Sequence, residues 1–149
     1  MLGKKDMKRE NKFVQIIIDT NVWISFFIGK MLSNLQYYIA NEQFQIITCA
    51  EQVVELKSVL SRRKITKYIS QQKVDEFINL LDEKAKLIEI ISEINICRDQ
   101  KDNYLLSLAI DSSADFLISG DLDLLSIKQI GNTKIINFKE FENIFLHTK

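Results

Sequence analysis

Short runs of β-branched residues alternate along this chain with longer segments of helical periodicity, and this alternation constrains the fold most strongly. The first run, FVQIII at residues 13–18, has the pattern of a strand that is buried on both faces. Further strands are predicted at 44–48, 87–91, 116–118 and 135–136. Helices are predicted at 31–42, 50–61, 70–81, 99–109 and 138–145. This order predicts an α/β fold in three layers, with a central parallel sheet of about five strands flanked by helices.

The length and composition of the chain predict one domain with a short tail. A chain of 149 residues fits a single domain, and with no proline and only four glycines it contains no linker-like stretch. Residues 1–12 are polar and basic, so we predict a disordered tail there and a folded domain at 13–149. No signal peptide is evident, and no stretch approaches the roughly 20 apolar residues that cross a bilayer. We therefore expect a cytoplasmic protein without a membrane partner.

The positions of the cysteines and of the histidine argue against thiol- or imidazole-based catalysis. Cys49 and Cys97 are far apart, form no CxxC pattern and lie beside apolar runs, so we predict reduced, buried thiols. The only histidine, His147, lies at the C-terminal end of the sequence, where chain ends commonly fray. A hydrolase with this sequence would therefore depend on metal-bound water rather than on an imidazole base.

Six acidic side chains follow predicted strands or lie near the beginning of predicted helices. They are Asp19, Glu55, Asp99, Asp102, Asp121 and Asp123. Ligands of open parallel sheets bind outside the carboxyl ends of the strands, so we expect several of these acids at one edge. Each acid taken alone is more commonly a turn former or a helix cap. Packed together, ionised carboxylates repel one another, which raises their pKa values. A bound divalent cation removes this repulsion.

The ligand type selects among metal ions. Carboxylate oxygens are hard ligands, which favour Mg²⁺ or Mn²⁺ over zinc. Mg²⁺ retains several waters and also binds phosphate oxygens, so the predicted site suits hydrolysis of a phosphodiester.

Three segments carry a characteristic order of motifs: IIIDTNVWIS at 16–25, CRDQKDNYLLSLAIDSSADFLISGDLDLL at 97–125, and IINFKEF at 135–141. They resemble the PIN domain family, and more narrowly its VapC-like toxins from prokaryotic toxin–antitoxin pairs. The resemblance covers nearly all of the chain from Phe13, and the 97–125 segment is its most specific part. It implies the PIN fold and a Mg²⁺- or Mn²⁺-dependent ribonuclease. The implied partners are an RNA substrate, an antitoxin protein and a second copy in a homodimer.

The resemblance assigns roles to four acids. The first to fourth family acids match, in order, Asp19, Glu55, Asp102 and Asp121. It implies that Asp19, Asp102 and Asp121 hold the metal, with Asp102 acting directly or through water. Glu55 is expected to orient metal-bound water or to complete the ligand shell. Glu51, one helical turn earlier on nearly the same face, is the alternative for this role.

Further residues complete the predicted site. Asn21 and Ser119 match polar positions that support the acids in the family, and Asp123 is an additional acid at the rim. Asp99 is predicted to cap its helix, which directs the N–H groups of that helix toward the cleft.

The charge distribution permits RNA contacts without requiring them. The formal net charge is zero, so the chain has no overall attraction to nucleic acid. A run of basic residues is more often solvated surface than a binding site. One basic cluster is nevertheless a candidate for phosphate contacts. It consists of Arg62, Arg63, Lys64 and Lys67.

Other classes of protein remain open. The PIN fold can serve as a non-catalytic RNA- or protein-binding domain, although all four acids are present here. Another metal-dependent phosphoryl hydrolase is a further alternative. Haloacid-dehalogenase-like phosphatases begin with DxDxT after the first strand, whereas this chain has Asp19 and then Asn21 in place of the second aspartate. Single-stranded DNA also remains open as a substrate, because metal-assisted hydrolysis does not require a 2′-hydroxyl.

Overall fold

One mixed sheet organises the protein. The computed structural model describes residues 13–29 and 32–146. Within these ranges the strands are β1 (Val14–Ile18), β2 (Phe44–Thr48), β3 (Lys86–Leu87), β4 (Phe116–Ile118), β5 (Gln129–Ile130) and β6 (Thr133–Ile136). The helices are α2 (Thr20–Ile28), α3 (Leu32–Ala40), α4 (Ala50–Leu60), α5 (Arg63–Thr66), α6 (Gln71–Lys84), α7 (Gln100–Ser112), α8 (Leu122–Leu125) and α9 (Phe138–Leu146).

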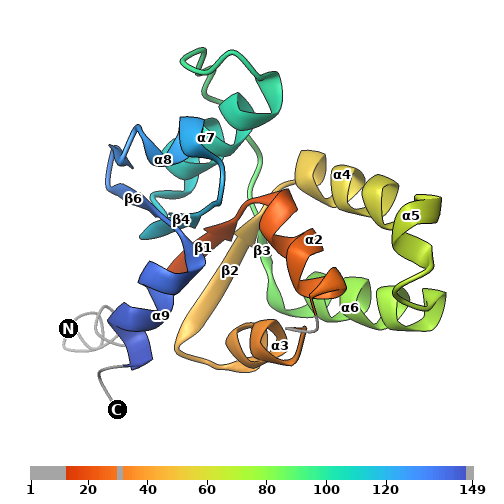
Figure 1. Ribbon diagram of the computed structural model, residues 1–149. Coiled ribbons are helices and arrows are strands. Elements are labelled where there is room, and N and C mark those ends of the chain that lie inside the picture. Colours follow the sequence, from red (N-terminus) through yellow and green to blue (C-terminus); the bar gives the residue numbers. More distant parts are fainter. Residues whose placement is uncertain (1–12, 30–31, 147–149) are drawn as a thin grey trace.

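The strands lie in the order β3-β2-β1-β4-β6-β5, with β1 and β4 in the middle (Figure 1). β1 pairs in parallel with β2 and β4, and β3 and β6 extend the parallel array on either side. Parallel neighbours need long crossover connections, and the helices supply them. The predicted parallel sheet is therefore confirmed for these five strands.

An antiparallel edge strand, β5, was not predicted and makes the sheet six-stranded in the described part of the chain. A two-residue loop, Gly131-Asn132, joins β5 to β6, and the φ angle of Gly131 is +56°. Two-residue hairpin loops use left-handed backbone, which glycine adopts without a steric penalty. The hairpin covers the free edge of β6.

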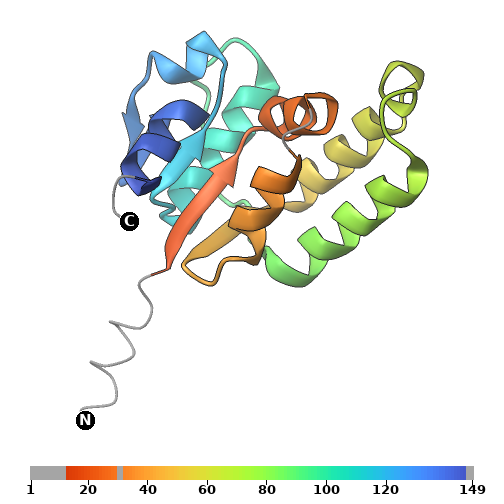
Figure 2. The ribbon, with the colours of Figure 1, turned by 60° about the horizontal axis from the view of Figure 1, so that its bottom comes forward.

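Alternate residues of β1 are buried on opposite faces of the sheet, as the two-residue period of a strand requires. Ile16 and Ile18 belong to the apolar cluster that also contains side chains of α2, α3, α4, α6 and α9. Ile17 belongs to a second cluster with side chains of α7 and α8. The helices therefore form one layer on each face, which confirms the predicted three-layer architecture (Figure 1 and Figure 2).

The strand predicted at 87–91 is shorter in the structure, where β3 ends at Leu87. Only Lys86 and Leu87 pair with β2, and residues 88–96 continue without regular secondary structure. Backbone N–H groups of this segment are bound instead by two side chains of α7, Asp111 and Asn103. Side chains of α7 therefore bind three backbone N–H groups of the segment at positions where a longer strand would bind a neighbouring strand.

The polar turn that the sequence suggests after the first strand is the beginning of α2, and Asp19 is its N-cap. Turn formers and N-cap residues are the same residue types, so the pattern alone does not separate them. Cys49 is buried as predicted, whereas Cys97 is only partly buried, and both are free thiols.

Two further expectations concern the chain ends and the membrane. The predicted tail at 1–12 and His147 lie outside the described residues. Among the helices that are described, none is both long and apolar enough to cross a membrane.

Candidate metal centre

The centre begins where β1 and β4 end side by side. Ile18 and Ile118 are paired in register, so the next residues of both strands, Asp19 and Ser119, emerge at the same level of the sheet. The Asp19 N–H donates to the Ile118 carbonyl over 2.9 Å, which fixes the backbone at this point. Asp19 is only 6% exposed, and its Oδ1 accepts from the backbone N–H of Asn21 over 3.2 Å.

Ser119 connects two of the predicted acids. Its Oγ donates to Asp19 Oδ2 over 2.8 Å and accepts from the Asp121 N–H over 3.0 Å. Asp121 caps α8 by accepting from the backbone N–H of Asp123 over 2.9 Å. Because Ser119 is fully buried, this one hydroxyl fixes the orientation of Asp19 and the start of α8 together.

The N-terminal end of α7 brings in the third predicted acid. Asp99 caps this helix, as predicted, by accepting from the Lys101 N–H over 3.0 Å. Asp102 lies in the first turn and is 7% exposed. One oxygen each from Asp102, Asp121 and Asp123 lies within 4.8 Å of the others, close enough for one cation to bind all three.

The structure thus groups the acids somewhat differently from the prediction. Asp123, expected at the rim, belongs to the three-acid group with Asp102 and Asp121. Asp19 is not in that group, but it is joined to Asp121 through Ser119 and interacts electrostatically with both Asp121 and Asp102.

The electrostatics of the cluster disfavour ionised carboxylates. Burial, followed by the nearby charges of Asp121, Asp99 and Asp19, raises the pKa of Asp102 from 3.8 to about 7. Burial also raises the pKa of Asp19; hydrogen bonds from Ser119 and Asn21 oppose this shift, and the charges of Asp121 and Glu55 add to it. A divalent cation compensates such repulsion, and an all-oxygen donor set fits Mg²⁺ or Mn²⁺.

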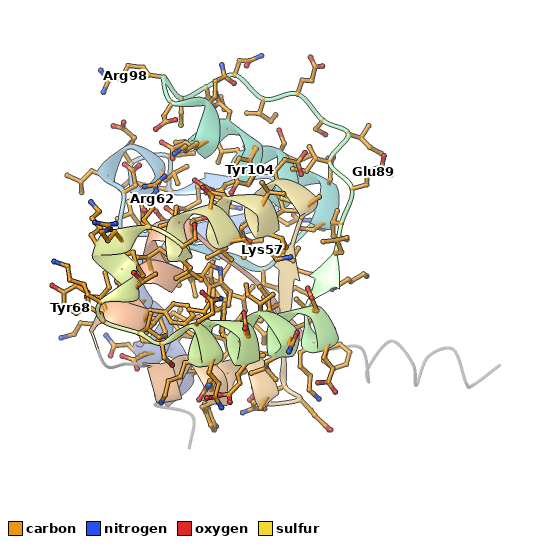
Figure 3. All side chains as sticks on the ribbon, turned by 90° about the vertical axis from the view of Figure 1, so that its right-hand side faces the viewer. Lys57, Arg62, Tyr68, Glu89, Arg98 and Tyr104 are labelled. Atoms are coloured by element: carbon orange, nitrogen blue, oxygen red, sulfur yellow. The ribbon has the colours of Figure 1, made fainter. Side chains whose placement is uncertain are left out.

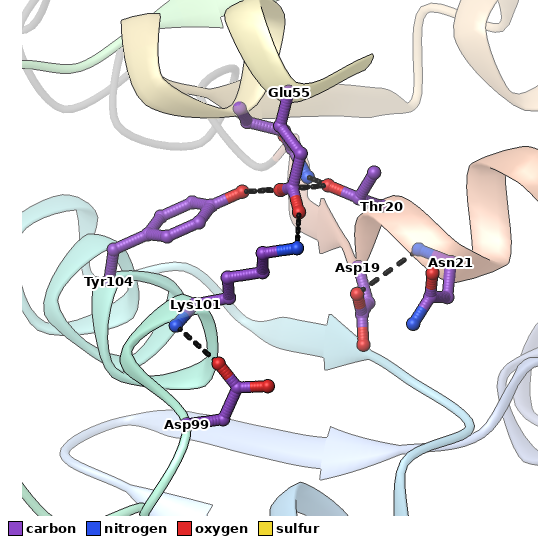
Figure 4. Close-up of polar contacts among 8 residues, drawn as sticks. Asp19, Thr20, Asn21, Glu55, Asp99, Lys101 and Tyr104 are labelled. Carbon is purple, nitrogen blue, oxygen red and sulfur yellow. Dashed lines mark hydrogen bonds and ion pairs between the residues drawn. The ribbon is translucent and has the colours of Figure 1, made fainter. Parts of the chain in front are cut away.

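Glu55 faces the acids from α4 and is held by a network of its own (Figure 4). Its Oε1 accepts from Thr20 Oγ over 2.9 Å and from the Tyr104 hydroxyl over 2.7 Å. Its Oε2 lies 3.6 Å from Lys101 Nζ, and the Glu55 side chain is 19% exposed. The alternative acid, Glu51, is exposed on the same helix.

A buried amide ties α4 to β1. Gln52 Nε2 donates to the Ile18 carbonyl over 2.6 Å, and Gln52 Oε1 accepts from Thr48 Oγ over 2.6 Å. Since Ile18 directly precedes Asp19, the helix that carries Glu55 is anchored at the first acid. Neither Gln52 nor Tyr104 was predicted as a site residue. For Gln52 the only available signal was its i, i+4 spacing with the buried Leu56.

The basic cluster lies at the far end of α4, on and around α5, and Figure 3 shows Arg62 there. All four of its side chains are exposed. Arg98, also exposed, lies 3.6 Å from Asp123 in an ion pair at the acid cluster itself. The described residues therefore place one cationic side chain, besides Lys101, directly at the site.

Comparison with known proteins is consistent with this geometry. The model of the PIN domain family matches residues 15–123. The chain therefore belongs to the PIN domain family. It is 28% identical over 128 residues to the uncharacterized protein MJ1680 of Methanocaldococcus jannaschii, covering 81% of this chain and 79% of that protein.

The fold also matches a chain of VapBC2 from Rickettsia felis, in a crystal structure with a DNA fragment from their promoter. The TM-score is 0.53 at 19% identity, and the match covers 83% of this chain and 98% of the other. The resemblance to the PIN fold that the sequence suggests is thus confirmed.

Proposed function

We propose that this protein is a Mg²⁺- or Mn²⁺-dependent ribonuclease and the toxin of a toxin–antitoxin pair. The observation that carries the proposal is the convergence of acids from three separate parts of the chain on one sheet edge. Asp102, Asp121 and Asp123 come within 4.8 Å of one another there, and Ser119 joins Asp19 to the group. Membership of the PIN domain family supports a nuclease.

In this proposal, the aspartates hold the ion and Glu55 orients water. Asp19, Asp102 and Asp121 would hold the ion, with Asp123 as an additional ligand. A bound divalent ion lowers the pKa of its water and stabilises negative charge on a phosphate. Ser119 keeps Asp19 turned toward the cluster. Glu55 is fixed by Thr20 and Tyr104 at a position from which it can accept a proton or a hydrogen bond from water.

Positive groups at the rim would contact the RNA backbone. Lys101 and Arg98 lie at the site itself, paired with Glu55 and Asp123. The basic cluster on and around α5 would contact phosphates farther along the RNA strand. Such contacts position RNA without reading its sequence.

The test is cleavage of a mixed panel of RNA and single-stranded DNA with Mn²⁺, Mg²⁺ or EDTA. We expect RNA cleavage that needs the ion and that falls about a hundredfold or more in Asp19→Asn, Asp121→Asn and Glu55→Gln. Glu51→Gln is the matched control on the same helix and should retain activity. Cleavage that survives Asp19→Asn and Asp121→Asn would contradict the proposal, as would cleavage of DNA alone. Metal binding without any cleavage would indicate the non-catalytic alternative.

The proposed protein partners are an antitoxin and a second copy of the chain. The structural similarity to a VapBC2 chain supports an antitoxin. Size-exclusion chromatography with light scattering tests the homodimer. Co-purification with the product of the neighbouring reading frame, and loss of RNA cleavage in that complex, tests the antitoxin.

A further inference from the structure

A pocket lies beside the acid cluster and shares a wall with it. It has a volume of about 310 Å³ and lies between α2, α9 and the residues that follow β4. We propose that this pocket binds a nucleobase of the RNA strand, next to the phosphate held at the acids. The inference rests on the proposed function, which it extends by naming a substrate subsite.

The walls of the pocket suit the face of an aromatic ring. Val22, Phe26 and Phe138 are its large apolar lining residues, and none of the described lining residues is charged. The rings of Phe26 and Phe138 meet edge to face, with centroids 4.8 Å apart, so the walls support each other. Bases present apolar faces that proteins commonly hold against aromatic side chains.

The rim of the pocket supplies groups for the polar edge of a base. Asn137 Oδ1 accepts from the Glu140 N–H over 2.8 Å, which leaves the Asn137 amide N–H groups as donors. Ser25 Oγ donates to the Val22 carbonyl over 2.8 Å, which leaves its oxygen as an acceptor. A donor and an acceptor around an apolar floor match a heteroaromatic ring better than an aliphatic side chain.

Two adjacent residues connect the pocket wall to the acid cluster. Ser119 and Gly120 line the pocket, while the Ser119 hydroxyl binds Asp19 and the backbone of Asp121. A single nucleotide, whose ribose links base and phosphate, could therefore occupy both places at once.

Gly120 is a lining residue at which bulk can be added to the pocket wall. A Cβ atom added there meets no heavy atom within 4 Å, and the φ angle of Gly120 is not in the left-handed region. Gly120→Ala therefore adds a methyl group without a clash, and Gly120→Leu extends the side chain further from the same position. Val54→Leu is the matched control, because it adds bulk to a residue that is 67% exposed on α4.

The first experiment does not depend on catalysis. Adenosine, guanosine, cytidine and uridine, which carry no phosphate, are titrated into ¹⁵N-labelled metal-free protein and followed by NMR. We expect at least one nucleoside to shift the amide signals of Ser25, Gly120 and Asn137. Gly120→Leu should abolish these shifts and Val54→Leu should retain them. Shifts with N-acetyl-leucinamide and none with any nucleoside would overturn the proposal in favour of a protein side chain.

The second experiment measures RNA cleavage. Gly120→Leu should raise KM about tenfold, as expected for the loss of one base contact, with Gly120→Ala intermediate. An RNA with an abasic site at the subsite position should be cleaved equally by wild type and Gly120→Leu. Nucleoside shifts without any RNA cleavage would support the pocket and contradict the nuclease. RNA cleavage with no nucleoside shifts and an unchanged KM in Gly120→Leu would support the nuclease and contradict the pocket.

Discussion

At the scale of single residues, the hydroxyl of Tyr104 is the most informative group that the sequence did not identify. It donates to Glu55 Oε1 over 2.7 Å, and burial together with this bond to Glu55 raises the pKa of Tyr104. The phenol therefore stays protonated and acts as a permanent donor. It limits the positions that Glu55 can take within the site.

We predict that Tyr104→Phe lowers kcat about tenfold or more, because a hydrogen bond to a charged group is lost while the ring remains. KM and the far-UV circular dichroism spectrum should change little. Tyr37→Phe is the control, since the Tyr37 hydroxyl binds only Asn41 among the described residues and its side chain is exposed. An equal loss of activity in both variants would contradict a role in positioning Glu55.

The second prediction at this scale concerns Ser119. Ser119→Ala removes the donor to Asp19 and the acceptor for the Asp121 N–H, so it should weaken Mn²⁺ binding about 10–100-fold. Ser119→Thr, which keeps the hydroxyl, should restore most of the affinity. Titration calorimetry gives both values. Ser61→Ala removes an exposed hydroxyl at the C-terminal end of α4, where it donates to the Ser58 carbonyl, and should leave the affinity unchanged.

At the scale of elements, the segment at 88–96 is bound to the sheet through the Ile88 N–H and, farther along, to side chains of α7. Asp111 accepts hydrogen bonds from the backbone N–H groups of Ile91 and Ser92 and from the Ser92 hydroxyl. These bonds lower the pKa of Asp111, with the bond from the Ser92 side chain contributing most. Their stabilisation is therefore present at neutral pH and is lost as the pH falls through the folded-state pKa.

We predict that Asp111→Ala destabilises the protein by about 1–3 kcal/mol, because backbone donors lose a charged acceptor. Amide hydrogen exchange at Ile91 and Ser92 should accelerate at neutral pH, while exchange in β1 should change only with global stability. Asp75→Ala, on the exposed side of α6, is the comparison variant. Unchanged exchange at Ile91 in Asp111→Ala would contradict this account.

The elements also show what sequence could predict. Short, mainly apolar runs predicted β1, β2 and β4, because burial on both faces leaves a clear pattern. The short helices α5 and α8 and the two-residue β5 were not predicted, since so few residues carry no periodic signal. Helix α2 was not predicted either, and its first residues were interpreted as a turn because aspartate serves both purposes.

The same limits apply to the candidate site. Strand ends predicted that Asp19 and Asp121 would lie at one edge, and they do lie together through Ser119. The bond between Tyr104 and Glu55 joins residues 49 positions apart on two helices. Such a contact depends on how α4 and α7 pack, which no local pattern encodes.

At the scale of the whole molecule, the buried acids lower stability in the absence of a cation. The folded-state pKa of Asp102 is about 7, against an ordinary value of 3.8, mainly because of burial and then because of neighbouring charges. Between these values the folded protein binds more protons than the unfolded chain. The free energy of unfolding of the metal-free protein therefore falls as the pH rises from about 4 to about 7.

We predict that metal-free protein is less stable at about pH 7.5 than at about pH 5, by on the order of 1 kcal/mol or more. Urea unfolding with EDTA measures the difference, and Asp102→Asn should remove most of it. Excess Mn²⁺ should restore stability at the higher pH, since an ion that binds only the folded state stabilises it. A stability that rises with pH, or no effect of Mn²⁺, would contradict the interpretation.

The distance along the chain between the two halves of the acid cluster determines when the site can exist. The hydrogen bond from Ser119 to Asp19 spans 100 positions. At a synthesis rate of about 5–20 residues per second, Asp19 is made several seconds before its partners. Until residues 116–123 have been made, β1 has no β4 beside it, and the carboxylates of Asp121 and Asp123 are missing. A polypeptide that ends before residue 119 therefore lacks the hydroxyl that orients Asp19 and two of the three clustered acids, so the site can assemble only after those residues have been made.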